Sequence, residues 1–137
     1  MMRVENNNRC FACGKENPFG LQVHPEISPD GMQVKIECVP PDHFQGWANI
    51  VHGGILSTLL DEAITYVGIA NFDGPAVTAQ LDIRFKNPAR AGQKLLVTAN
   101  RLKAGKRLIE VVAEIKLQDG TQIAEGTGKV MKAAGAF

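Results

Sequence analysis

The sequence predicts an α+β domain in which one long helix is wrapped by an antiparallel β-sheet of about five to six strands. Two observations support this fold class. One apolar helical pattern extends from about 54 to 70, and the residues after 76 form successive segments that alternate with a period of two. The chain has 137 residues, so we expect a single domain over 1–137, with 1–19 as an N-terminal segment.

The strands are expected on both sides of the helix in the chain. Asp119-Gly120 is a strong hairpin signal with strand residues on both sides. Before the helix, 20–27 and 31–39 are expected to form another strand pair. The four alternating segments after the helix cover 76–86, 95–105, 107–118 and 121–131. We expect these four segments to form an antiparallel meander.

The helix is predicted to be covered on nearly all sides. Apolar residues occupy about half of the helical wheel. The opposite arc carries small and polar residues, and Asp61 is its charged residue. No Lys or Arg occurs over 48–72. Because a solvated face normally carries several charges, we expect a second subunit or a ligand to cover this arc. Ala124, Gly126 and Gly128 share one face of the last strand segment, which predicts a closely packed neighbour.

Composition and charge exclude several classes of function. The chain carries 15 Lys and Arg against 14 Asp and Glu, so it lacks the basic surplus typical of nucleic-acid binding. The sequence has no run of about 18 apolar residues, so it predicts no membrane span. The first residues also lack the apolar stretch of a signal peptide. Three cysteines argue against a disulfide framework. We expect a cytoplasmic protein without nucleic-acid or membrane partners.

His52, Gly53 and Gly54 lie where the helix is expected to begin. The first amides of a helix have no intrahelical partner, and the helix dipole places partial positive charge there. Glycines let a substrate oxygen approach these amides, which makes them a candidate oxyanion site. Asp61 follows about 10 Å further along the helix. Taken alone, a His-Gly-Gly before a helix is commonly just a flexible start of the helix, and a lone Asp is commonly solvated. Their combination on one helix favours a catalytic site.

Three stretches resemble the hotdog-fold thioesterases of the phenylacetate-pathway and human thioesterase-superfamily type: GWANIVHGGILSTLLDEA, VTAQLDIRFKNPARAGQKL and AEGTGKVM. The opening CFACGKENPFGL is similar to the N-terminal signature of one subgroup, so the resemblance covers about residues 10–132. It implies an acyl-CoA thioesterase whose site lies at the interface of a homodimer, or of a homotetramer made of two dimers. It implies no cofactor apart from the coenzyme A of the substrate.

The resemblance also implies roles for individual residues. Gly53 or Gly54 gives a backbone amide to the thioester carbonyl, and His52 helps to place that carbonyl. Asp61 of the facing subunit is the general base or the nucleophile. The hydroxyl of Thr78 helps to hold the attacking water.

Further residues are candidates for contact with the substrate. Several relatives carry Asn or Gln upstream of the His-Gly-Gly, a role that Gln45 or Asn49 could fill, and Trp47 lies in the same stretch. Glu62 is the alternative acid to Asp61, although it faces the apolar border of the helix. The candidates to bind the phosphates of coenzyme A are Arg84, Lys86, Arg90 and Lys106.

The CxxC spacing of Cys10 and Cys13 is typical of zinc ligands, but a structural zinc site needs four ligands, commonly with a second close pair. Only single candidates follow, at His24, Cys38 and His43. We therefore expect a tight turn without a metal, and chelators that leave folding and activity unchanged.

Two other functions use the same residues. The fold also hosts acyl-thioester hydratases and dehydratases, which pair a catalytic histidine with an acid. His52 and Asp61 could take these roles, although the glycine pair and the spacing favour hydrolysis. The second alternative is a non-catalytic acyl-CoA-binding protein, which we would expect to carry a DNA-binding extension that this length does not accommodate.

Overall fold

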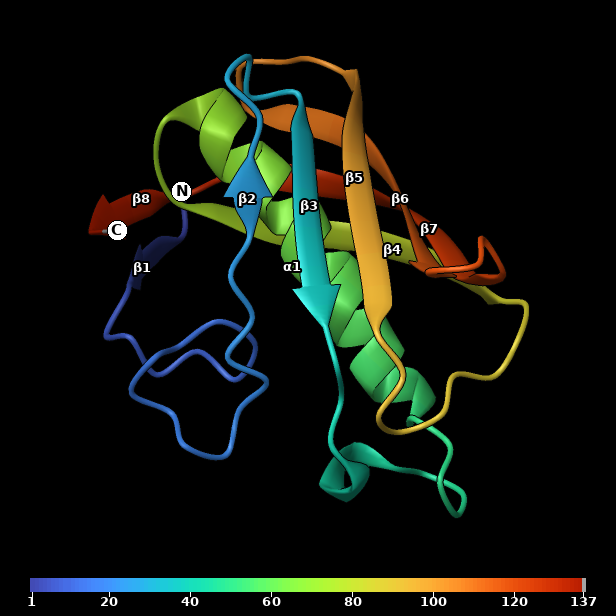
Figure 1. The fold of residues 1–137 in the computed structure, drawn as a ribbon. Helices are drawn as coiled ribbons and strands as arrows, with labels where there is room; N and C mark the ends of the chain where they lie inside the picture. The colour runs from blue at the N-terminus through green and yellow to red at the C-terminus, as the bar shows by residue number, and fades with distance from the viewer. Residues whose placement is uncertain (137) are drawn as a thin grey trace.

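The computed structural model describes residues 1–136, which form one α-helix packed against a six-stranded antiparallel sheet (Figure 1). The helix is α1 (Gly53–Phe72), and the short 3₁₀ helix η1 (Asp42–Phe44) precedes it. The sheet contains, in spatial order, β2 (Glu26–Ile27), β3 (Gln33–Cys38), β5 (Leu95–Lys103), β6 (Leu108–Leu117), β7 (Gln122–Lys132) and β4 (Ala76–Phe85). A separate parallel pair joins β1 (Arg3–Glu5) to β8 (Ala134–Ala136) beside the two termini. The predicted fold class is confirmed.

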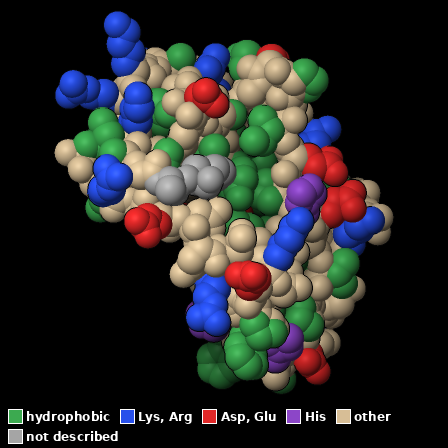
Figure 2. All heavy atoms as spheres, turned by 90° about the vertical axis from the view of Figure 1, so that its left-hand side faces the viewer, with side chains coloured by type: hydrophobic (Ala, Val, Ile, Leu, Met, Phe, Trp, Pro, Cys, Tyr) green, Lys and Arg blue, Asp and Glu red, His purple; other side chains and the backbone are tan. Residues whose placement is uncertain are grey.

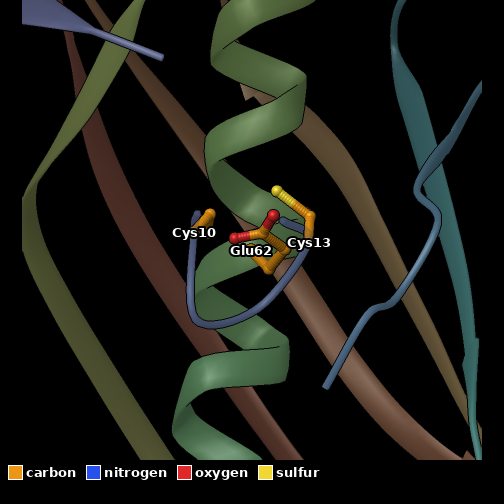
Figure 3. A group of neighbouring side chains, drawn as sticks. All are labelled: Cys10, Cys13 and Glu62. Carbon is orange, nitrogen blue, oxygen red and sulfur yellow. The ribbon is translucent and has the colours of Figure 1, made fainter. Parts of the chain in front are cut away.

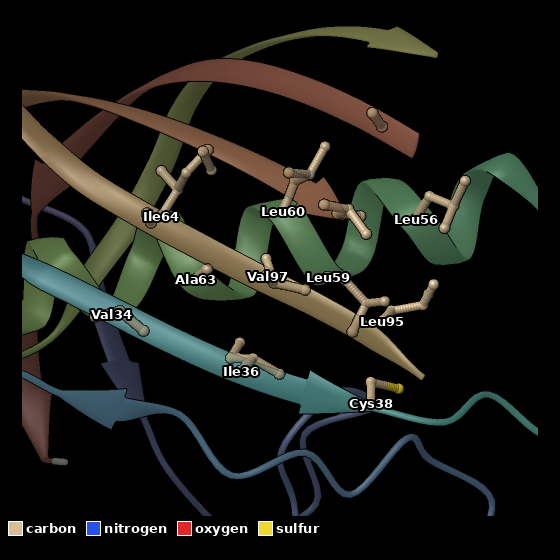
Figure 4. Packing of buried hydrophobic residues seen from close by; sticks show 14 of the residues in the cluster. Val34, Ile36, Cys38, Leu56, Leu59, Leu60, Ala63, Ile64, Leu95 and Val97 are labelled. Carbon is tan, nitrogen blue, oxygen red and sulfur yellow. The ribbon is translucent and has the colours of Figure 1, made fainter. Parts of the chain in front are cut away.

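The core lies between α1 and the concave side of the sheet (Figure 4). Alternate residues of the strands point at the helix, as the period of two predicts. The largest fully buried side chains include Ile36, Leu59, Leu60, Ile64, Leu95 and Ile115. Because these residues come from the helix and from three strands, the core fixes the position of α1 along the sheet.

Glycines let the helix approach β7 closely, as the sequence predicts. A Cβ atom added at Gly128 would lie 2.8 Å from Cγ2 of Ile64. On the helix side, a Cβ added at Gly68 would lie 2.5 Å from Cγ1 of Val130. A larger residue at either position would therefore push α1 away from the sheet.

The strand order corrects the predicted four-strand meander. Only β5, β6 and β7 form a meander, whereas β4 pairs with β7 and β5 pairs with β3. The chain therefore crosses from β4, at one edge of the sheet, to the interior strand β5. Alternation along a strand reports which face is buried and says nothing about which strand lies beside it, which is why the sequence led to the wrong neighbour.

The prediction of a strand over 20–27 is also mostly wrong. Only Glu26–Ile27 pairs with β3, because the residues before it bond to the N-terminal loop instead. The Leu21 N–H donates to the Phe11 carbonyl at 2.9 Å, and the Val23 N–H donates to the Ala12 carbonyl at 3.0 Å. The CxxC segment is thus held against the body of the domain.

On the side of the molecule where the N-terminal segment lies, the surface is not dominated by charges of one sign. Figure 2 shows basic and acidic side chains spread over this side of the molecule. Across residues 1–136, no helix has both the length and the apolar character needed to cross a membrane.

Candidate active site

The start of α1 leaves one backbone amide available. Nδ1 of His52 accepts a hydrogen bond from the Gly54 N–H at 2.8 Å, and the His52 carbonyl accepts from the Ile55 N–H at 2.9 Å. Within residues 1–136, the Gly53 N–H has no acceptor. Of the two glycines predicted to bind the carbonyl, Gly54 is therefore used to cap the helix, and Gly53 is free to bind an oxyanion at the positive end of the dipole.

The cap also determines which nitrogen of His52 can face a ligand. Because Nδ1 accepts, the neutral ring carries its proton on Nε2, an assignment that follows from the hydrogen-bond geometry. His52 is exposed and borders an open depression of about 530 Å³. The depression is lined by Gly46, Trp47, Ile50, Val51, His52 and Gly53. A second donor, Nε2–H, can thus accompany the Gly53 amide.

The loop before α1 carries three predicted binding residues, of which Trp47 lines this depression. Oε1 of Gln45 accepts from the Asn49 N–H at 2.7 Å, and this closes the loop on itself. Asn49 adopts a left-handed conformation with φ of 63°. Trp47 is 86% exposed, so it is a rim residue and has no place in the core. All three lie beside the helix start, although the side-chain oxygen of Gln45 is already engaged within the loop.

Asp61 is anchored through one oxygen. Thr78, on β4, donates its hydroxyl proton to Oδ1 of Asp61 at 2.5 Å. Thr78 Oγ1 lies 3.1 Å from Thr65 Oγ1, so Thr65 donates to Thr78. Sequence analysis missed Thr65, although it lies four residues after Asp61 and therefore on the same helix face.

No cation neutralises Asp61. Among the residues that the structure describes, no Lys, Arg or His nitrogen lies within 4.0 Å of its carboxylate, and Oδ2 has no hydrogen-bond donor. The carboxylate is partly exposed. One oxygen is therefore fixed by protein, and the other is free to take a proton from water or to attack an electrophile.

The two halves of the site are far apart in one chain. Gly53 and Asp61 lie on the same straight helix, and eight residues of helix rise separate them by about 12 Å. A single carbonyl group cannot contact both. The structure thus brings Asp61 and Thr78 together, and His52 and Gly53 together, but does not unite the two pairs within one chain.

Glu62, the alternative acid, is buried. It is 9% exposed and points toward Cys10 and Cys13 of the N-terminal loop (Figure 3). Burial raises the pKa of the Glu62 carboxyl. Burial and the adjacent Glu62 raise the pKa of the Cys13 thiol to about 12. Glu62 therefore faces the N-terminal loop, and a role for it in substrate binding stays a prediction.

Three of the four basic candidates lie at the end of β4 or in the loop that follows it. Arg84 belongs to β4, Lys86 follows that strand, and Arg90 forms a β-bridge with Ile50 of the loop before α1. Lys86 is already paired, with its Nζ 3.1 Å from Oε1 of Glu125. Arg84 and Arg90 are therefore the less constrained candidates for phosphate binding.

Lys106 lies elsewhere. It belongs to the turn between β5 and β6, next to Gly105, whose carbonyl accepts from Nδ2 of Asn71 at 3.1 Å. Asn71 is in the last turn of α1, so Lys106 is near the opposite end of the helix from Gly53. Within one chain it cannot act with Arg84 and Arg90.

Comparison with known proteins identifies the family. The profile of the thioesterase superfamily matches residues 48–124, which include the helix start, Asp61 and Thr78. The chain belongs to the thioesterase superfamily. Acyl-coenzyme A thioesterase 13 of Mus musculus is 33% identical over 82 residues, or 59% of this chain and 54% of the relative. The chain thus spans about half the length of the curated relatives it matches.

Solved structures share the fold. The PaaI protein from the phenylacetic acid degradation operon of E. coli aligns with a TM-score of 0.77 and 24% identity, over 85% of this chain and 84% of that chain. Thioesterase superfamily member 2 of Mus musculus aligns with a TM-score of 0.70 and 25% identity, over 80% and 81% of the two chains. These similarities confirm the predicted hotdog fold.

Proposed function

We propose that this superfamily member is an acyl-CoA thioesterase, which hydrolyses an acyl-CoA to a free acid and coenzyme A. The observation that carries the proposal is the Asp61 carboxylate, which has one oxygen held by Thr78 and no cation to neutralise it. A carboxylate that is fixed through one oxygen and has no countercharge keeps its other oxygen available to act as a base or a nucleophile. The name of the mouse relative, acyl-coenzyme A thioesterase 13, supports the same activity.

In the proposed mechanism, the Gly53 N–H and His52 Nε2–H bind the carbonyl oxygen of the thioester. Asp61 takes a proton from water as the water oxygen bonds to the carbonyl carbon, and the charge that forms on the carbonyl oxygen is stabilised at the helix start. Collapse of this intermediate breaks the C–S bond and expels the thiolate of coenzyme A, which then takes up a proton. Direct attack by Asp61 would instead form an acyl-enzyme anhydride that water hydrolyses.

The proposal requires two copies of the chain. Because about 12 Å separates Gly53 from Asp61 along α1, the carboxylate that serves one helix start is Asp61 of the partner subunit. β4, with ten residues, is an edge strand that pairs only with β7 within the described chain. A long unprotected edge normally finds a partner. We propose a homodimer, or a homotetramer made of two such dimers, with β4 and the polar side of α1 near the interface.

The geometry favours hydrolysis over hydration. A hydratase would need His52 to act as an acid or base, but its Nδ1 is engaged with the Gly54 amide. A residue that caps a helix and presents a fixed Nε2–H is better suited to binding a carbonyl than to moving a proton.

The test is a turnover screen over short, long and aromatic acyl-CoA substrates. Coenzyme A release should be followed by chromatography, because disulfide dyes would also react with the exposed thiol of Cys10. Multiple turnovers that yield equal amounts of free acid and coenzyme A are expected. Addition of water to an enoyl-CoA without coenzyme A release would point to a hydratase, and binding without turnover would point to a non-catalytic acyl-CoA-binding protein.

A further inference from the structure

Three potential metal ligands meet between the N-terminal loop and the middle of α1. The sulfur atoms of Cys10 and Cys13 and a carboxylate oxygen of Glu62 all lie within 4.8 Å of one another. Figure 3 shows the three side chains converging from the loop and from the helix. None of them belongs to the site formed by Gly53 and Asp61. Glu62 follows the CxxC spacing by about fifty residues, so only the fold brings it near the two cysteines.

The loop that carries the two cysteines is shaped to present both sulfurs on one side. The Gly14 N–H donates to the Cys10 carbonyl at 2.9 Å, and the Ala12 N–H donates to Cys10 Sγ at 3.3 Å. A Cβ at residue 14 would lie 2.4 Å from the Cys10 nitrogen, so the turn requires glycine there. An amide that donates to sulfur stabilises the thiolate form that a metal binds.

Glu62 supplies independent evidence for a ligand. Its side chain is 9% exposed, and Oε1 has no hydrogen-bond partner in the structure. A buried carboxyl oxygen without a partner is costly, and native proteins rarely leave one unexplained. The unpartnered oxygen belongs to the same carboxylate that lies beside the two sulfurs. A cation bound between these groups would compensate the carboxylate.

We propose that Cys10, Cys13 and Glu62 bind a divalent zinc-class metal ion. Two thiolates with one carboxylate suit Zn²⁺ better than Mg²⁺ or Ca²⁺, which prefer oxygen ligands alone. In a tetrahedral site with Zn–S bonds of about 2.3 Å, two sulfurs lie about 3.8 Å apart. The three side chains can reach that geometry from their present separations by small rotations.

The surroundings of the cluster leave room for a fourth ligand. A cavity of about 200 Å³ adjoins the cluster and is lined by Cys10, Cys13, Glu62 and Tyr66 among others. The fourth position can be taken by water, by a small ligand or by an oxygen of Glu5 or Asn6, which also line the cavity. The hydroxyl of Tyr66 lies 3.4 Å from Cys13 Sγ and can donate to the thiolate, as groups around metal ligands commonly do. The bound ion would fasten the N-terminal loop to α1 at the residue next to Asp61.

Cobalt titration tests the proposal directly. Untagged protein is freed of metal, kept reduced with a phosphine that does not chelate, and titrated with Co²⁺, whose thiolate charge-transfer absorption reports sulfur ligation. We expect one equivalent to bind and to be displaced by Zn²⁺. Cys10→Ser, Cys13→Ser and Glu62→Gln should each weaken binding by more than about a hundredfold, beyond the usual cost of losing a group around the ligands. Cys38→Ala is the matched control, because Cys38 is a buried core thiol outside the cluster.

The readouts separate the proposal from its alternatives. Circular dichroism and cooperative melting of each variant show whether it is folded, so that lost binding is not confused with unfolding. Absence of charge-transfer absorption in the folded, reduced wild-type protein would overturn the proposal. It would also be overturned if Glu62→Gln bound Co²⁺ as tightly as the wild type, or if Cys38→Ala lost binding to the same extent as the Cys10 variant.

Discussion

Replacing Thr78 by valine should slow hydrolysis without weakening substrate binding. Valine has nearly the shape of threonine but cannot donate to Oδ1 of Asp61, which is 2.5 Å from the hydroxyl in the wild-type protein. A hydrogen bond to a charged group contributes about 1.5–3 kcal/mol. Because Asp61 is partly exposed, solvent screening favours the lower end, and 1.5 kcal/mol corresponds to about a tenfold loss of kcat. KM should change little, because Thr78 touches Asp61 and acts as a positioning residue.

Two further variants make this prediction specific. Thr78→Ser keeps the hydroxyl and should restore most of kcat, and Thr65→Val removes only the donor to Thr78, so it should cost less than Thr78→Val. The assay is steady-state release of coenzyme A, with kcat and KM determined separately for each variant. The reasoning is refuted if Thr78→Val retains wild-type kcat, or if Thr78→Ser is as impaired as Thr78→Val.

Three other predictions follow from the fold and the divided site. Sedimentation should show a dimer or tetramer at micromolar concentration, and an active monomer would contradict the shared site. Gly128→Ala should lower the free energy of unfolding by about 1–3 kcal/mol, because the new Cβ meets Ile64. Gly74→Ala should be nearly neutral in the same denaturant titration, because its Cβ would make only an ordinary contact, 3.9 Å from the Phe72 carbonyl oxygen. His52→Ala should lower the free energy of unfolding by about 0.5–2 kcal/mol through loss of the helix cap; an unchanged value would argue against that cap.

Local patterns were sufficient to predict the elements that position the site. The helix expected over about 54–70 is observed as Gly53–Phe72, because apolar residues with a period of 3.6 and an arc charged only at Asp61 allow few alternatives. The close approach predicted from Gly126 and Gly128 is confirmed, since side chains of α1 occupy the space in front of both. These features depend on neighbours in the sequence, which is why they could be predicted.

The features that the sequence did not predict all depend on contacts between distant segments. The pairing of β4 with β7 is one example, because alternation does not encode which strands are neighbours. Burial of Glu62 agrees with its place on the apolar border of the helix, but its partners come from the loop at Cys10 and Cys13. The separation of Gly53 from Asp61 along one helix could be calculated from the sequence, whereas the anchoring of Asp61 by Thr65 through Thr78 required the fold.

The most direct test of the central claim is the activity of Asp61→Asn. Asparagine keeps an oxygen to accept from Thr78 but removes the charge that activates water, so kcat should fall by at least about a hundredfold. Binding of an unreactive acyl-CoA analogue should change little, and Glu62→Gln should cost less than about tenfold in kcat. If Asp61→Asn retains most of the activity while Glu62→Gln abolishes it, the assignment of the catalytic acid is wrong.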